Sequence, residues 1–153
     1  MWFQLALGSL LIAITAVAAA LSWWGLEAVL VRTHRWATRP PHGPKLTAIL
    51  SLSMLWALMM MTASVWIWAL AFWALKTFDT FEASVYFALV VFTTLGFGDV
   101  LLPTEWRLLG GLAAANGLLT FGILTAMLVE TLRQTRLSQR NSVSPTRSRP
   151  LER

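Results

Sequence analysis

Hydrophobic residues fill three long stretches of the chain, and shorter segments that carry most of the charged residues separate them. The three stretches are Phe3 to Val31, Leu46 to Leu75 and Trp106 to Leu132. Each is longer than the roughly 20 residues that an α-helix needs to cross a hydrocarbon core about 30 Å thick. The pattern therefore predicts an all-α membrane protein with three transmembrane helices, whose extra length implies tilted helices or protruding ends.

Composition and the placement of charge support this class and add an orientation. The chain is 57% hydrophobic and 12% charged, a balance typical of integral membrane proteins. Cations concentrate in segment 32–45 and in the tail, whereas the loop 76–105 carries four acids and one lysine. Because cytoplasmic loops are enriched in Lys and Arg, we predict a multi-pass protein of the cell membrane, the inner membrane if bacterial, with its N-terminus outside. The formal net charge of +5 is then an orientation signal and does not indicate a nucleic-acid partner.

The segment between the second and third stretches does not look like an ordinary polar loop. Asp79 and Glu82 have the spacing of a capping box, and Phe81 to Thr93 reads as a short apolar helix. We expect a re-entrant pore helix over residues 80–93 that points its C-terminus, the negative end of its dipole, into the membrane. Irregular backbone at membrane depth is tolerated only where it lines a cavity or is buried in protein.

The run that follows, Thr93-Thr94-Leu95-Gly96-Phe97-Gly98-Asp99, predicts a cation filter. Gly96 and Gly98 adopt positive φ angles without steric cost, so adjacent carbonyls can face one axis. Backbone carbonyls arranged in this way replace the hydration shell of a potassium ion. The expected K⁺ ligands are the carbonyls of Thr94, Leu95, Gly96 and Phe97 with the Thr94 hydroxyl, and Gly98 and Asp99 are expected to support the outer mouth. The alternative is a simple glycine turn between two helices.

At these residues the sequence resembles the pore-domain module of potassium channels, and its Gly-Phe-Gly filter is similar to that of two-pore-domain potassium channels. The resemblance covers Leu46 to about Arg133, because residues 116–126 (NGLLTFGILTA) are similar to the inner helix of small bacterial channels. It implies an outer helix 46–75, a filter 94–99 and an inner helix 106–132. It also implies a hinge at Gly117 and cavity-facing side chains at Leu118, Phe121 and Thr125, whose spacing of three and four places them on one helical face.

Three positions depart from the usual pattern of that family. Phe97 replaces a tyrosine and so lacks a hydroxyl that could bond to the surrounding helices. Val90 stands where some members have a carboxylate paired with the aspartate at the mouth, so we expect Asp99 to lack that partner. Leu95 replaces a valine, which keeps the carbonyl and changes only the packing behind the filter.

The remaining segments complete the domain organisation. Residues 1–31 form an extra transmembrane helix without the arginine ladder of a voltage sensor. Residues 32–45 are predicted to be a basic cytoplasmic linker, and residues 134–153 a basic, disordered cytoplasmic tail. Because one chain supplies a single pore loop, the functional unit is predicted to be a homotetramer with four-fold symmetry, surrounded by membrane lipid.

Several other residues have two readings. Glu27 is expected to pair with Arg32 or Arg35, and Glu130 either pairs with Arg133 or helps to form a cation-concentrating ring. Asn116 is expected to form an interhelical hydrogen bond and not to face the cavity. His34 and His42 are pH-sensor candidates or solvated interfacial residues. Close-packing positions are expected at Gly110, Gly111, Ala114 and Ala115. An outer aromatic belt is expected at Trp66, Trp68, Trp73 and Trp106.

These features predict a potassium-selective channel that conducts K⁺ passively and needs no cofactor. A weakly selective Na⁺/K⁺ channel and a non-conducting assembly module are the alternatives. An enzyme is disfavoured because no segment assembles a nucleophile with a base or a set of metal ligands, and the acids and histidines are predicted on opposite sides of the membrane.

Overall fold

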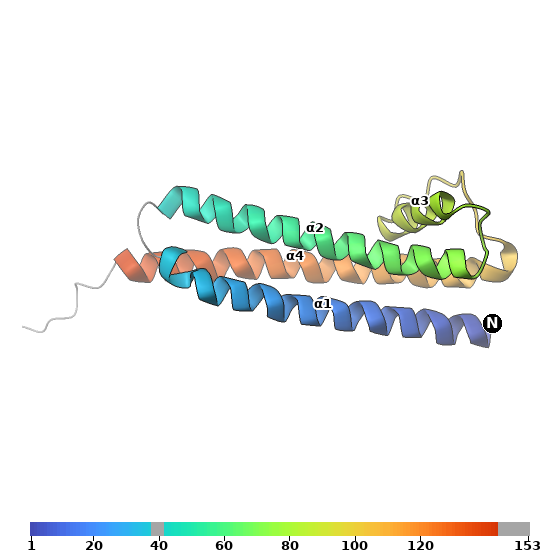
Figure 1. The fold of residues 1–153 in the computed structure, drawn as a ribbon, viewed down its shortest axis with the longest axis horizontal. Coiled ribbons are helices and arrows are strands. Elements are labelled where there is room, and N and C mark those ends of the chain that lie inside the picture. The colour runs from blue at the N-terminus through green and yellow to red at the C-terminus, as the bar shows by residue number, and fades with distance from the viewer. Residues whose placement is uncertain (38–41, 144–153) are drawn as a thin grey trace, which may run out of the picture.

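The structure is a computed structural model that describes residues 1–37 and 42–143, and within these the side chains of residues 1–29, 31–32 and 44–137. Throughout the described residues the elements are helices, so the predicted all-α class is confirmed. Three long helices lie side by side along the length of the molecule, and one short helix packs at one end (Figure 1). The elements are α1 (Trp2–Ala37), α2 (His42–Ala74), α3 (Phe81–Phe92), a single 3₁₀ turn η1 (Thr104–Trp106) and α4 (Arg107–Val143).

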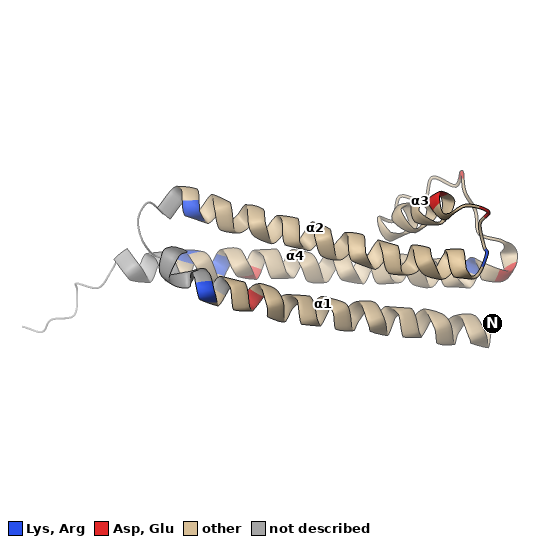
Figure 2. Ribbon diagram, in the orientation of Figure 1, with Lys and Arg blue, Asp and Glu red and all other residues tan. Residues whose placement is uncertain are grey.

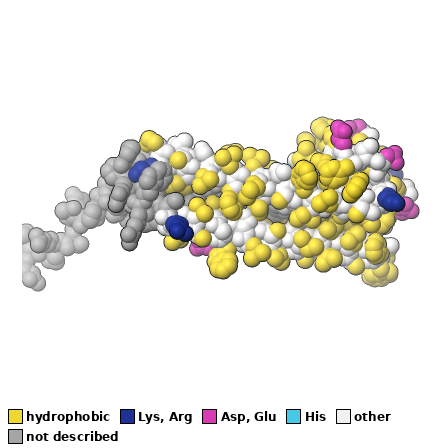
Figure 3. Space-filling view, viewed as in Figure 1, with side chains coloured by type: hydrophobic (Ala, Val, Ile, Leu, Met, Phe, Trp, Pro, Cys, Tyr) yellow, Lys and Arg dark blue, Asp and Glu magenta, His cyan; other side chains and the backbone are white. Residues whose placement is uncertain are grey.

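Each of the long helices contains a span that is long and apolar enough to cross a membrane. The spans are Trp2–Val29, Pro44–Ala74 and Thr104–Leu137. On the face that Figure 3 shows, hydrophobic side chains are spread along the length of these helices, and the charged side chains lie toward the two ends. Exposed apolar surface of this extent suits a hydrocarbon solvent. The chain is a multi-pass membrane protein, and the prediction of three spans is confirmed.

The long helices extend further than the sequence predicted. The helices extend into the predicted basic linker 32–45, because α1 continues to Ala37 and α2 already begins at His42, with residues 38–41 outside the description. Similarly, α4 runs to Val143, well into the predicted disordered tail, of which residues 144–153 lie outside the described part. Neither extension contains an interior helix breaker, since Pro44 falls in the first turn of α2, where proline is tolerated. Polar helices can therefore continue beyond the apolar spans.

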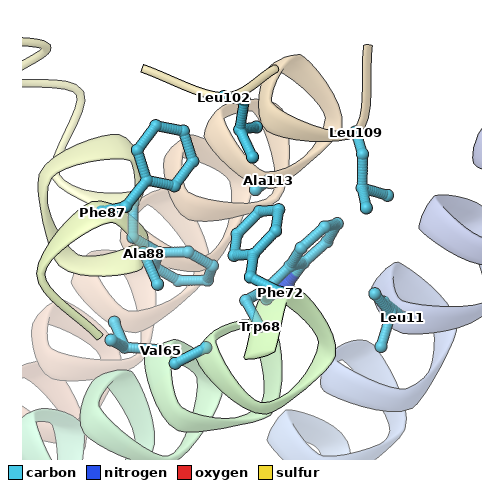
Figure 4. Close-up of a cluster of buried hydrophobic side chains, with 11 residues drawn as sticks. Leu11, Val65, Trp68, Phe72, Phe87, Ala88, Leu102, Leu109 and Ala113 are labelled. Atoms are coloured by element: carbon cyan, nitrogen blue, oxygen red, sulfur yellow. The ribbon is translucent and has the colours of Figure 1, made fainter. Parts of the chain in front are cut away.

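The core of the protein lies where α2, α3 and α4 meet. Phe72 of α2 is fully buried, with its ring centroid 5.3 Å from that of Phe87 on α3 in an edge-to-face arrangement. Figure 4 shows Trp68 beside it, between the α3 side chains and Leu11 of α1. Because Trp68 is 0% exposed, the prediction that it belongs to an outer aromatic belt is wrong. Edge-to-face aromatic pairs add to the energy of area burial, so this cluster fixes α3 against the two long helices.

The extra helix α1 is bonded to the rest of the bundle at three levels. The Asn116 side-chain amide of α4 donates a buried 2.8 Å hydrogen bond to the hydroxyl of Thr15. The indole of Trp56 on α2 donates to the hydroxyl of Ser22 at 2.6 Å. Near the N-terminus the Gln4 amide bonds to the Glu105 carbonyl. Polar contacts between helices are favoured in a bilayer because they satisfy groups that lipid cannot, so α1 is an integral part of the bundle.

A tight turn connects α2 to α3. The amide of Lys76 donates to the Trp73 carbonyl at 2.9 Å, and Lys76 adopts a φ of +53°, the left-handed conformation that usually favours glycine after a helix. The predicted cap of α3 was one residue off. The N-cap is Thr80, whose hydroxyl accepts from the Ala83 amide at 3.2 Å, and not Asp79.

The charged residues divide between the two ends of the molecule. Figure 2 shows mainly acidic residues at the end that carries α3 and mainly basic residues at the opposite end. Below we call the first the α3 end and the second the basic end. This division follows the sequence pattern from which the orientation was predicted.

Candidate functional site

The candidate site begins at the C-terminus of α3. The amides of Thr94 and Leu95 donate to the carbonyls of Val91 and Val90, each at 3.0 Å. The hydroxyl of Thr93 donates to the Leu89 carbonyl at 2.8 Å. These bonds satisfy carbonyls that a helix end leaves without partners, and they attach the next residues firmly to α3.

The following backbone alternates in handedness. Thr94, Gly96 and Gly98 have φ angles of +58°, +58° and +79°, whereas the residues between them do not have positive φ. Alternation of left- and right-handed residues turns successive peptide units the same way, so their carbonyls can line one side of the strand instead of opposite sides. The two glycines adopt this conformation freely, as the sequence predicted.

Thr94 is the residue in this segment whose conformation the sequence did not predict. A β-branched residue at positive φ is a backbone outlier that costs on the order of 1–3 kcal/mol. Such strain persists only where surrounding contacts enforce it, and here the Thr94 amide is bonded to α3. The strained position marks the first residue of the segment as part of the site.

The whole segment from Thr94 to Asp99 is exposed in the single chain. The Leu95 and Phe97 side chains are 61% and 66% exposed. Residues 95–98 carry only hydrophobic side chains or none. An exposed apolar segment of this kind, in a strained loop, is unusual unless another surface covers it. The exposed segment is therefore accessible to another surface.

Asp99 has a partner that the sequence analysis missed. The phenolic hydroxyl of Tyr86 on α3 donates a 2.6 Å hydrogen bond to Asp99 Oδ2. This bond is the main reason that the pKa of Asp99 is lowered, which keeps the carboxylate ionised. Asp99 therefore has no carboxylate partner at position 90, where Val90 stands, and the Tyr86 hydroxyl on α3 bonds to it instead. The sequence contained one indication of this bond. Tyr86, the single tyrosine of the chain, lies one helical turn before Val90 and on the same side of the helix.

Below the segment, α4 contributes the predicted cavity residues. Leu118 and Phe121 line one hollow with Phe92, Thr93 and Thr94, next to the start of the strained backbone. Its volume is about 220 Å³. Leu118 and Phe121 therefore lie on one face of α4, as their spacing predicted. Thr125 is also exposed, but its hydroxyl donates to the Phe121 carbonyl at 2.8 Å.

Gly117 permits the closest backbone contact in this region. A Cβ at position 117 would lie 2.3 Å from the Phe92 carbonyl oxygen and 2.7 Å from Phe92 Cα. Only glycine lets α4 approach the last turn of α3 this closely. The helix is continuous through Gly117, so its role as a hinge stays a prediction, while its packing role is a structural finding.

The other predicted residues divide into three groups. Asn116 makes the interhelical bond that was favoured, and Glu130 pairs with Arg133 at 3.1 Å. A Cβ at Gly110 would lie 2.7 Å from Leu102 Cδ1, so this position is tightly packed, whereas a Cβ at Gly111 would meet nothing within 4 Å. Glu27 forms no ion pair with Arg32, and the side chains of Arg35, His34 and His42 lie outside the description. Within the described residues no group of three His, Cys, Asp or Glu side chains could hold a metal ion.

Comparison with known proteins places this geometry in a family. No curated protein and no solved structure matches the chain at a significant level. A family profile described as ion channel matches residues 51–134, which include most of α2, all of α3, the strained segment and most of α4. The match covers more than half of the chain and leaves out α1. The matched range contains the exposed segment 94–99, and the chain belongs to the ion channel family.

Proposed function

We propose that the protein is a potassium-selective channel in which α3 is a re-entrant pore helix and residues 94–99 are the selectivity filter. The observation that carries this proposal is the alternating backbone at Thr94, Gly96 and Gly98. Rings of carbonyl oxygens of this kind substitute for the water around K⁺. The Thr94, Leu95, Gly96 and Phe97 carbonyls are the proposed ligands, and conduction is passive.

The proposed assembly is a homotetramer around the filter axis. One filter strand cannot surround an ion, and in one protomer the segment 94–99 and the side chains of Leu118 and Phe121 are exposed. Four-fold closure would bring these surfaces to a common axis. A pore closed in this way would have the filter above a cavity bounded by Leu118 and Phe121. Mass measurement of the solubilised complex should give four times the 17.0 kDa chain mass, and a monomer or dimer would refute this arrangement.

The proposed orientation puts the α3 end outside and the basic end in the cytoplasm, with the N-terminus outside. The placement of Arg32, Lys45, Arg133 and Arg136 at the basic end supports it by the positive-inside rule. Asp99 and Tyr86 would then stand at the outer mouth. An ionised carboxylate there raises the local concentration of cations.

The test is the reversal potential in a planar bilayer with K⁺ on one side and Na⁺ on the other. A hundredfold preference for K⁺ corresponds to a shift of about 120 mV, at about 59 mV per tenfold ratio of a monovalent ion. Gly96→Ala is the control, because a side chain at φ +58° is strained and should abolish the current. A potential near zero that still depends on Gly96 would identify a weakly selective cation channel. Absence of current in a correctly assembled tetramer would favour the assembly-module alternative.

A further inference from the structure

The surface at the α3 end contains a hollow that the channel function does not use. It lies at the turn between α2 and α3 and is lined by Trp73, Ala74, Lys76, Phe78 and Asp79. Its volume is about 460 Å³, within the range of about 300–1,000 Å³ of small-molecule sites. The hollow is separate from the strained segment 94–99 and from the α4 residues below it.

The hollow combines one cation, one anion and an apolar wall. Lys76 and Asp79 are exposed and form no ion pair with each other or with any other described side chain. The capping role that the sequence suggested for Asp79 belongs to Thr80, so the Asp79 carboxylate has no structural task in α3. Trp73 is 51% exposed and Ala74 is also exposed. One positive and one negative side chain, both unpaired and beside exposed apolar residues, suit a ligand that has a positive group, a negative group and an apolar part.

The backbone conformation of Lys76 is strained. Lys76 has a φ of +53°, a position where glycine is the usual residue and a lysine is strained. The turn is nevertheless well bonded, because the Thr77 hydroxyl and amide both donate to the Phe72 carbonyl, at 2.9 and 3.2 Å. A strained backbone position that carries a charged side chain supports a functional use of that charge.

The depth of the hollow in the membrane identifies the source of the ligand. Span Pro44–Ala74 contains 31 residues, about 46 Å of helix at 1.5 Å per residue. A bilayer with its headgroups measures about 40–45 Å. With Lys45 at one interface, residues 73–79 therefore lie among the headgroups of the other leaflet. Exposed tryptophan at this level is typical of membrane interfaces.

We propose that the hollow binds the headgroup of a zwitterionic phospholipid with a primary ammonium group, of the phosphatidylethanolamine type. The phosphate contacts the Lys76 ammonium, the lipid ammonium donates hydrogen bonds to the Asp79 carboxylate, and the acyl chains descend along Trp73 and Ala74. A carboxylate acceptor favours a primary ammonium, which has N–H donors, over a quaternary one. The site is in the outer leaflet if the proposed orientation holds, but its existence depends neither on that orientation nor on ion selectivity.

Native mass spectrometry of the detergent-solubilised full chain tests the proposal. Equal amounts of palmitoyl-oleoyl phosphatidylethanolamine, phosphatidylcholine and phosphatidylglycerol are added, and the retained lipid is counted per protomer. The wild-type chain should retain phosphatidylethanolamine preferentially. Asp79→Asn should lower the ratio of phosphatidylethanolamine to phosphatidylglycerol about two- to fivefold, the range expected for one exposed charge pair. Lys76→Gln should lower retention of all three lipids.

Matched controls separate the hollow from the general charge of the α3 end. Glu82→Gln removes an exposed acid three residues beyond Asp79, and Arg107→Gln removes an exposed cation of α4; neither residue lines the hollow, and neither change should alter the ratio. Lys76→Gly relieves the strained φ, so it should raise thermal stability while it lowers lipid retention. Equal retention of the three lipids by the wild-type chain would overturn the proposal. So would a preference that survives both Asp79→Asn and Lys76→Gln. Soluble glycerophosphoethanolamine should compete weakly, because it lacks the chains that contact Trp73.

Discussion

Replacement of Gly117 by alanine tests whether the contact between α4 and α3 sets the filter position. The added Cβ would lie 2.3 Å from the Phe92 oxygen, whereas ordinary contacts begin near 3.4 Å, so the Phe92 carbonyl must move by about 1 Å. The obstructing atoms are backbone, and no side-chain rotation can relieve the clash. Phe92 is the last residue of α3, two positions before Thr94, so the displacement passes directly to the first residue of the proposed filter.

The expected size of the effect follows from two opposing contributions. Alanine in place of glycine stabilises a helix interior by about 1 kcal/mol, whereas overpacking of a well-packed site costs about 1–3 kcal/mol. Because only backbone can move here, we take the upper part of that range and expect a net loss of about 1–2 kcal/mol. Displacement of a carbonyl ring by about 1 Å should also reduce K⁺ selectivity, since ion ligands must match the hydration shell closely.

The assay combines thermal unfolding in detergent with reversal potentials in a planar bilayer. Gly111→Ala is the matched control, because a Cβ at that position of α4 meets no atom within 4 Å and should only add helix stability. Gly117→Ala should lower the unfolding temperature and move the reversal potential toward zero. If Gly117→Ala instead kept the selectivity and stability of the control and changed only the open probability, the hinge role would be right and the packing role refuted.

Three further predictions follow from the contacts of the site and the core. Tyr86→Phe removes the hydrogen bond that lowers the pKa of Asp99, so this pKa should rise. The loss of K⁺ conductance on acidification should then begin at a higher pH than in the wild-type channel. An unchanged pH dependence of the conductance would contradict the assignment. Asn116→Leu leaves the Thr15 hydroxyl without its α4 partner and should destabilise the solubilised protein by about 0.6–1.7 kcal/mol, the range of hydrogen bonds between membrane helices, as measured by thermal unfolding. Phe72→Ala removes a fully buried ring of the α2–α3 core and should cost about 3–5 kcal/mol, and a smaller loss than that of Asn116→Leu would argue against this core.

The spans and the unusual segment could be predicted from sequence because each depends on local chemistry. A continuous apolar stretch of sufficient length has few alternatives to a membrane helix. Likewise, Gly96 and Gly98 can adopt left-handed conformations without steric cost, outside any predicted helix. The left-handed Thr94 could not be predicted in the same way, because its conformation is enforced by bonds to α3 and not by its own preference.

Contacts between distant segments explain the remaining differences. Trp68 is as suitable for an interface as Trp73 by composition, and only the packing of the helices around each residue decides that Trp68 is buried and Trp73 exposed. The Tyr86–Asp99 bond joins residues 13 positions apart, a separation that no helical periodicity predicts. The helix ends were missed for another reason: apolar length marks the membrane span, whereas the helix itself stops at a breaker or cap.

The packing of α1 also bears on how copies of the chain can assemble. On α4, Ala113, Asn116, Gly117 and Thr120 are buried against the other helices, including α1 through the Asn116–Thr15 bond. The opposite face stays exposed and includes Gly111, Ala115, Leu118, Leu119, Gly122 and Ala126. Because α1 and α2 occupy one side of α4, a neighbouring copy can approach α4 only from the exposed side. That side includes Leu118, which lines the hollow beneath Thr94, so the face left free by α1 is the face that the proposed tetramer requires. In the proposed tetramer, the extra helix would favour assembly around one axis by restricting α4 to one contact surface.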